Sequence, residues 1–151
     1  MYLLFLSVYF TVFLSLGLNA VDATPLDISA ELAIPSIGLE SDVTTLQLEN
    51  YSLKTPDLIV GSYSRAKNKT LLIGHSSTVF KDLDKVWDGA EIIYDDTVYH
   101  VLYSTVMKKE DINMNALLAG AERETLILMT CAGEDLGGGD ATHRLIIKAE
   151  V

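Results

Sequence analysis

From residue 32 onward, the chain consists mainly of eight short runs that favour β-strands, separated by turn signals. Val, Ile, Leu, Thr and Tyr are frequent in these runs, and such side chains pack well on a pleated sheet. Only residues 77–86 and 112–121 have a pattern typical of helices. We therefore expect an all-β domain, a barrel or a sandwich, with one or two short helices. The eight runs are residues 32–37, 44–48, 57–60, 70–73, 91–94, 98–107, 125–130 and 144–151.

Charge and cysteine content exclude several classes of protein. With 11 Lys and Arg against 21 Asp and Glu, the formal net charge is −10, and a surface this negative repels the phosphates of nucleic acids. The single cysteine, Cys131, cannot form an intrachain disulfide, so a hydrophobic core must hold the fold together. Residues 32–151 are long enough to bury such a core. We therefore expect one domain without disulfides and no nucleic-acid partner.

The beginning of the chain is apolar. Residues 2–21 contain no charged side chain, and about twenty apolar residues are what a helix needs to cross a bilayer. Acidic residues follow, with no Lys or Arg before Lys54, and a lack of positive charge favours translocation of that side. We expect a single-pass cell-membrane protein: residues 1–21 as anchor or signal segment, 22–31 as acidic stalk and 32–151 as extracellular domain. The alternatives are that a peptidase removes the apolar segment near Ala20 or Ala23, or that the start codon is misplaced.

The reactive side chains lie at three strand ends. His75 follows the run 70–73, Cys131 follows the run 125–130, and Arg144 opens the last run. Cys131 and Arg144 belong to consecutive strands, and because neighbouring strands lie about 4.8 Å apart, the two residues are expected to be neighbours. His75 needs only to lie at the same rim.

These three residue types suit acyl transfer. A cysteine thiolate attacks a carbonyl carbon to form a thioester, an imidazolium protonates the leaving amine, and a guanidinium donates hydrogen bonds to the oxyanion. The pattern predicts an enzyme with Cys131, His75 and Arg144 in these roles.

Several segments occur together in an order and spacing that resemble the sortases, exported cysteine transpeptidases of mainly Gram-positive bacteria. The resemblance extends from about residue 32 to the end of the chain. It implies a closed eight-stranded β-barrel with Cys131 as nucleophile, His75 as general acid and base, and Arg144 as oxyanion donor. The segments are AIPSIGL at 33–39, LLIGHS at 71–76, FKDL at 80–83, DGAEI at 88–92, LMTC at 128–131 and HRLIIKA at 143–149.

The resemblance also implies a substrate and an acceptor. A sortase cleaves an LPXTG-like sorting signal of a surface protein between Thr and Gly, and transfers the acyl group to an amine on a peptidoglycan precursor or on a pilin lysine. Thr130 would be a supporting substrate contact, and residues 107–124 would wall the substrate groove. The residues around Cys131 and the glycine-rich stretch after it resemble class F or class D/E sortases. The usual basic cytoplasmic tail is missing, and Gly89-Ala90 replaces the usual Gly-Asp.

Other functions of the same residues remain as alternatives. The protein could be a thiol hydrolase without transfer, or an inactive scaffold on the same barrel. His75, Cys131 and His143 could instead hold copper. His143 and Arg144 are adjacent on a strand, however, and adjacent strand residues point to opposite faces, so His143 should not share a site with Arg144.

Two further features have a simpler explanation. His100 alternates with apolar residues and is expected to be a strand residue that faces solvent. The carboxylates of residues 134–140 could hold Ca²⁺, but they do not follow the EF-hand pattern, so we expect no cofactor. Glycines 137–139 are expected to give this stretch the freedom to open and close beside Cys131.

Overall fold

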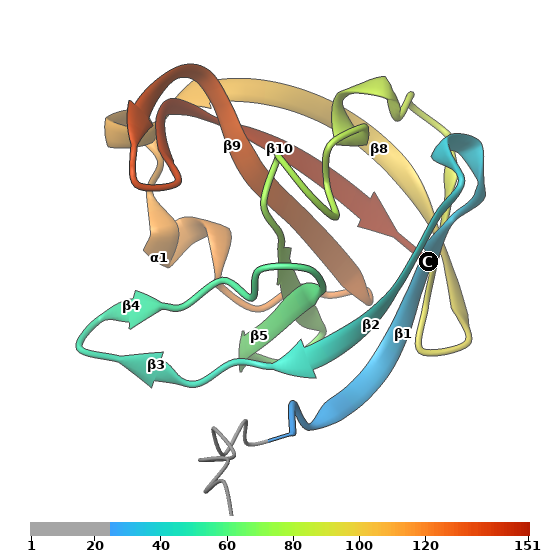
Figure 1. Ribbon diagram of the computed structural model, residues 1–151. Coiled ribbons are helices and arrows are strands. Elements are labelled where there is room, and N and C mark those ends of the chain that lie inside the picture. Colours follow the sequence, from blue (N-terminus) through green and yellow to red (C-terminus); the bar gives the residue numbers. More distant parts are fainter. Residues whose placement is uncertain (1–24) are drawn as a thin grey trace, which may run out of the picture.

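The computed structural model describes residues 25–151; the expected membrane segment lies outside the described residues. Eight strands close into a barrel in the order β1-β2-β5-β6-β9-β10-β8-β7 (Figure 1), which confirms the all-β barrel. A separate two-stranded hairpin, β3–β4, projects from it. The barrel strands are β1 (Ile28–Ile34), β2 (Leu39–Thr45), β5 (Val60–Ala66), β6 (Lys69–Ile73), β7 (Glu91–Tyr94), β8 (Thr97–Lys108), β9 (Thr125–Gly137) and β10 (Asp140–Glu150). The hairpin consists of β3 (Leu48–Glu49) and β4 (Ser52–Leu53).

The helices are short, as the sequence predicts. They are the 3₁₀ turns η1 (Pro35–Ile37), η2 (Leu83–Lys85) and η3 (Lys109–Asp111), and the single α-helical turn α1 (Met114–Leu117). Within residues 25–151, no helix has the length and apolar character needed to cross a bilayer.

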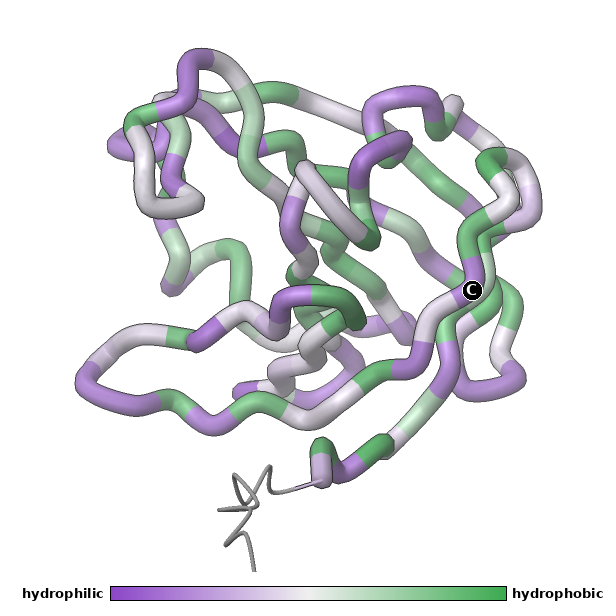
Figure 2. The backbone as a smooth tube through the Cα atoms, viewed as in Figure 1, coloured by the Kyte–Doolittle hydropathy of each residue, from purple (hydrophilic) through white to green (hydrophobic). Residues whose placement is uncertain are grey.

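Two layers of apolar side chains surround β6, β9 and β10. One layer fills the barrel and includes Leu72, Leu128 and Ile147. The other lies on the outer face of the same strands, where Ile73 and Ile127 are buried beneath side chains from α1 and the β3–β4 hairpin. Where both faces are covered, each strand has a continuous hydrophobic run, residues 71–73, 126–129 and 145–147, and the tube in Figure 2 shows the hydropathy along the chain.

Residues 77–86 do not form the expected helix. Several of their backbone N–H groups bond three residues back, as from Leu83 to the Phe80 carbonyl and from Val86 to the Leu83 carbonyl, which makes successive tight turns. Phe80, Leu83 and Val86 are all buried in the barrel core. An apolar spacing of three fits turns and 3₁₀ geometry, whereas an α-helix needs the 3.6-residue period.

The strand boundaries also differ from expectation at both ends of the domain. β1 begins at Ile28, so residues 28–31 belong to the barrel and not to a stalk. β9 continues to Gly137 and β10 begins already at Asp140, so the glycine-rich stretch forms a β-hairpin instead of a long loop. Gly137, Gly138 and Gly139 all have positive φ angles, which lets the chain reverse tightly there.

Candidate active site

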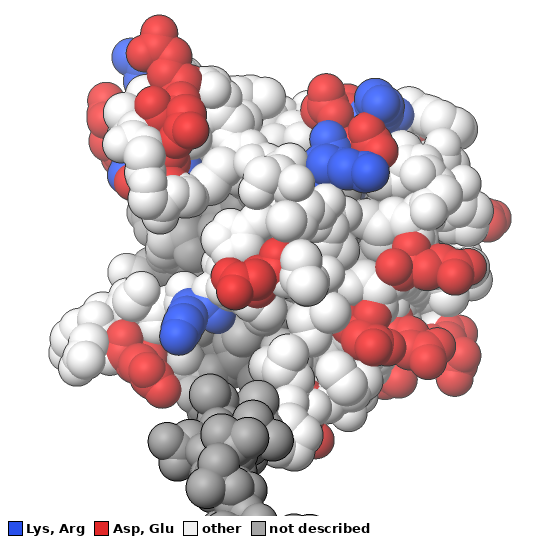
Figure 3. All heavy atoms as spheres, viewed as in Figure 1, with Lys and Arg blue, Asp and Glu red and all other residues white. Residues whose placement is uncertain are grey.

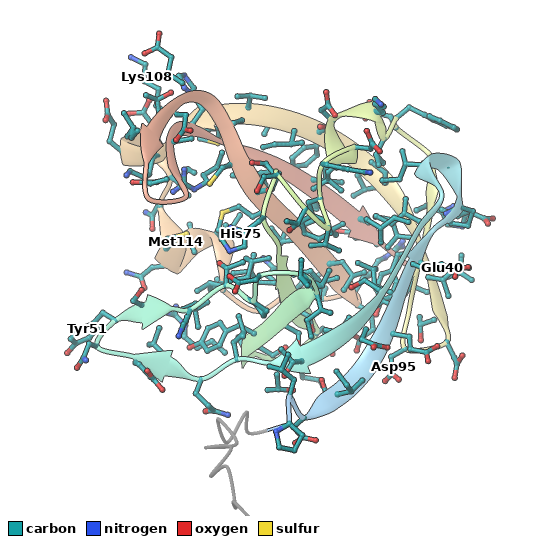
Figure 4. The ribbon with its side chains drawn as sticks, viewed as in Figure 1. Glu40, Tyr51, His75, Asp95, Lys108 and Met114 are labelled. Carbon is teal, nitrogen blue, oxygen red and sulfur yellow. The ribbon has the colours of Figure 1, made fainter. Side chains whose placement is uncertain are left out.

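A pocket of about 520 Å³ lies on the outer face of the barrel, between the β3–β4 hairpin, α1, the end of β6 and the middle of β9 and β10 (Figure 4). His75 follows a strand end as expected, whereas Cys131 and Arg144 lie within their strands, because β9 and β10 extend further than the sequence predicts. Most of its lining is apolar, and none of its lining residues is Asp or Glu. Acidic side chains lie instead on other parts of the face shown in Figure 3. The apolar lining includes Leu48, Leu53, Leu71, Ile73, Met114, Leu118 and Met129, and the polar lining includes Arg65, His75, Thr130, Cys131 and Arg144.

Register brings His75, Cys131 and Arg144 into one row across the barrel rim. In the parallel pair β6–β9, Ile73 lies opposite Met129, and His75 and Cys131 each follow two residues later. In the antiparallel pair β9–β10, Cys131 lies opposite Arg144. Adjacent strands are about 4.8 Å apart, and residues two apart share a face. The three side chains therefore line the same pocket, continuous with the outer apolar layer.

The thiol of Cys131 is accessible from the pocket. Its side chain is partly buried, and Sγ donates a hydrogen bond to the Gly139 carbonyl at 3.5 Å. Gly139 lies at the turn of the β9–β10 hairpin, where φ is +79°. A Cβ added to Gly139 would lie only 3.8 Å from Cε1 of His75. The hairpin turn thus contacts Cys131 and lies near His75.

The position of His75 is fixed by its backbone and by its neighbour Gly74. The His75 carbonyl accepts hydrogen bonds from the N–H groups of Thr78 at 3.2 Å and Phe80 at 3.1 Å. A Cβ on Gly74 would come within 2.8 Å of the Phe80 ring, so only glycine fits. Among the described residues, the carboxylate nearest to His75 is that of the exposed Asp57, whose Oδ1 is 4.0 Å from Nε2 of His75, too far for a hydrogen bond.

Arg144 is held by three hydrogen bonds. Nη1 donates to the carbonyls of Ala141 and His143, each at 2.9 Å, and Nη2 donates to Oδ1 of Asp140 at 2.7 Å. The other carboxylate oxygen of Asp140 accepts from Lys109. Hydrogen bonds from the two cations hold the pKa of Asp140 well below its usual range, and the bond from Lys109 has the larger effect.

Thr130 lines the pocket but also has a structural contact. Its hydroxyl is buried and donates a 2.7 Å hydrogen bond to the carbonyl of Gly74, next to His75. This bond ties the segment that carries His75 to strand β9. The expected substrate contact by Thr130 stays a prediction, and the hydroxyl already has this partner.

Replacing Thr130 by Val removes the donor and keeps the side-chain shape. We expect Thr130→Val to lower the free energy of unfolding by about 1–3 kcal/mol, because the buried Gly74 carbonyl loses its partner. Urea unfolding followed by circular dichroism measures the change. The control is Thr70→Val, since the Thr70 hydroxyl only contacts that of Ser64 at the surface. An equal effect of both changes would contradict a special role for the Thr130 bond.

His143 and His100 do not belong to the pocket. Nδ1 of His143 lies 2.7 Å from the Thr142 hydroxyl, on the side where Gly133 packs, so the expectation that His143 and Arg144 diverge is confirmed. His100 is exposed on β8, as expected. Among residues 25–151, no three His, Cys, Asp or Glu side chains gather as a metal site would require, so His75, Cys131 and His143 do not form a copper centre.

The hydrogen-bond partners of Arg144 were not expected from the sequence. Asp140 appeared only as a candidate calcium ligand, whereas its carboxylate is bound by Lys109 and Arg144. The four-residue spacing does not predict this pair, because strand residues four apart are about 13 Å apart and bulges interrupt the alternation of side chains here. Glycines 137–139 were expected beside Cys131, but the hydrogen bond from Cys131 to the Gly139 carbonyl depends on the hairpin fold.

Comparison with known proteins identifies the family. The family model described as the sortase domain matches residues 32–151. The chain belongs to the sortase family. Sortases are cysteine transpeptidases, and the row of His75, Cys131 and Arg144 contains the residue types that the resemblance implied. No curated protein sequence matches this sortase.

Solved structures of other sortases share the fold. Sortase A from Corynebacterium diphtheriae is 19% identical, with a TM-score of 0.64 over 83% of this chain and 61% of that one. Listeria monocytogenes sortase A is 17% identical, with a TM-score of 0.63 over 82% and 86% of the two chains. Sortase C-1 from Actinomyces oris is 22% identical, with a TM-score of 0.61 over 82% and 71%. This sortase therefore spans less than two thirds of the C. diphtheriae chain.

Proposed function

We propose that this sortase is an exported transpeptidase that cleaves an LPXTG-like sorting signal between Thr and Gly and transfers the acyl group to an amine. The observation that supports this most directly is the row formed by His75, just after the end of β6, and by Cys131 and Arg144, which lie opposite each other on β9 and β10. These side chains line one pocket, and the thiol is accessible from it.

The first half of the reaction forms a thioester. The Cys131 thiolate attacks the carbonyl carbon of the substrate threonine, and the oxyanion accepts hydrogen bonds from Arg144. As the C–N bond breaks, the His75 imidazolium gives its proton to the nitrogen of the departing glycine. The products are an acyl-enzyme and a free amino terminus.

The second half reverses these roles. An amine attacks the thioester carbonyl, neutral His75 accepts the proton that the amine loses, and the Cys131 thiolate leaves. A peptidoglycan precursor or a pilin lysine supplies the amine in this proposal. The thiol, imidazole and guanidinium supply the nucleophile, the acid and base, and the oxyanion donor, so the proposal assigns no cofactor.

The pocket lining supports an apolar peptide as the donor substrate. Leu71, Ile73 and Met129 precede the reactive row on β6 and β9 and share its face of the sheet. The leucine and proline of an LPXTG-like signal would bury apolar surface against such side chains. An anchor formed by residues 1–21 would hold the domain at the outer face of the cell membrane, where the surface-protein substrates and the amine acceptors meet. The class F or D/E assignment stays a prediction.

Trapping the intermediate tests this function. Incubation with a library of sorting-signal peptides should add an acyl group to Cys131, which mass spectrometry detects together with the preferred signal. Reactions with and without an amine acceptor should then give different products, a new amide with the amine and a free acid without it. Release of only the free acid in both reactions would instead support the thiol hydrolase.

A further inference from the structure

The guanidinium of Arg144 is only partly committed to the protein. An arginine has five N–H donors. Both Nη1 donors and one Nη2 donor bind Ala141, His143 and Asp140. The Nε donor and the second Nη2 donor have no hydrogen-bond partner among the described residues. Two donors therefore remain for an oxyanion, and the three bonds to the protein determine where those two can point.

The hairpin geometry explains how Asp140 reaches Arg144. The register of β9 and β10 shifts between Asp140 and Ala141, and again between Ala141 and His143. Such bulges bend a strand and redirect its side chains. The bend allows Arg144 to fold back along its own strand onto the Ala141 carbonyl and the Asp140 carboxylate.

The Asp140 carboxylate is itself fixed on both oxygens. Oδ1 accepts from Arg144 and from the Ala141 N–H, and Oδ2 accepts from Lys109 of η3. A carboxylate held in this way cannot turn freely, because rotation would break bonds to two cations. Lys109, Asp140 and Arg144 thus form a chain that runs from η3 to the pocket.

We propose that Asp140 is a positioning residue for catalysis, which orients Arg144 toward the oxyanion while Lys109 fixes the Asp140 carboxylate. This inference rests on the proposed function. Fixed donors stabilise an oxyanion better than mobile ones, because they need no reorganisation as the charge develops. The two bonds to backbone carbonyls do not replace Asp140, since neither carbonyl provides a charge to hold the guanidinium.

Asp140→Asn tests the proposal. Asparagine has only one side-chain acceptor oxygen, whereas Lys109 and Arg144 each bind a separate oxygen of Asp140. We expect kcat for peptide cleavage to fall about tenfold with KM changed less than about twofold, since the contact matters mainly once the oxyanion forms. Asp140→Glu should recover part of the loss. Lys109→Met should lower kcat less than Asp140→Asn does. Glu134→Gln is the matched control, because Glu134 lies in the same hairpin and its carboxylate makes no hydrogen bond among the described residues.

A double variant separates positioning from a general structural effect. If Asp140 acts through Arg144, adding Asp140→Asn to Arg144→Ala should cause no further loss in acyl-enzyme formation, measured by mass spectrometry over hours. A tenfold loss in both backgrounds, or an effect equal to that of Glu134→Gln, overturns the proposal. Thermal unfolding of each variant checks the fold, and Asp140→Glu provides the test if Asp140→Asn does not fold. Absence of a thioester in the unaltered protein would instead reject the proposed function.

Discussion

Cys131→Ala should abolish peptide cleavage, with a fall in rate of at least about 10³-fold, because removal of a covalent nucleophile leaves only binding and oxyanion stabilisation. No acyl group should remain on the protein after incubation with substrate. A chromatographic assay of peptide products measures the rate, and mass spectrometry measures the adduct.

The Cys131→Ala variant should keep the fold. The cysteine side chain is only partly buried, and its one hydrogen bond is a weak 3.5 Å contact with the Gly139 carbonyl. A circular dichroism melting curve close to that of the unaltered protein is therefore the control. Full cleavage by a folded Cys131→Ala protein would show that another group is the nucleophile.

Arg144→Ala should lower the cleavage rate by about 10²–10³-fold, the size expected for loss of an oxyanion donor. Most of the fall should appear in kcat, because the oxyanion exists only after the thiolate has attacked. Steady-state kinetics with a sorting-signal peptide separate the two constants. A change confined to KM would place Arg144 in substrate binding instead.

Two companion variants make the Arg144 result specific. Arg144→Lys keeps the positive charge but loses the planar fork that binds Asp140 and the two carbonyls, so it should recover little activity. Arg65→Ala removes a different pocket arginine, which bonds Asn115 and lies outside the reactive row. The kcat of the Arg65→Ala variant should change much less than that of Arg144→Ala. Arg144→Ala also frees Asp140 from one of its cations, so its thermal unfolding is measured alongside.

Asp140 should stay ionised at acidities where free aspartate is protonated. Its folded-state pKa is lowered by the hydrogen bonds from Lys109 and Arg144, so its contribution to stability is present above the ordinary value of 3.8 and is lost only as the pH falls through the lower folded value. NMR titration of the Asp140 carboxyl carbon should therefore show no protonation step near pH 3.8. A step at that pH would contradict the ion pairs.

Part of the active site could be inferred without coordinates. Cys131 and Arg144 belong to strands that follow one another along the chain, and antiparallel pairing of such strands is common, so their proximity was predictable. The divergence of His143 from Arg144 follows from strand alternation alone. The position of His75 in the same pocket as Cys131 does not follow from alternation, because it depends on β6 pairing in parallel with β9 across a long intervening segment.

The amino-acid sequence determined the strand content, the lack of disulfides and the residue types available for chemistry, because side-chain patterns and local propensities act over short distances. The tertiary structure decided which strand lies beside which, and so placed the imidazole in the same pocket as the thiol. It also decided that the glycine-rich stretch forms a bulged hairpin, which carries Asp140 to Arg144. Contacts of this kind depend on register and strand bending, which a linear pattern does not encode.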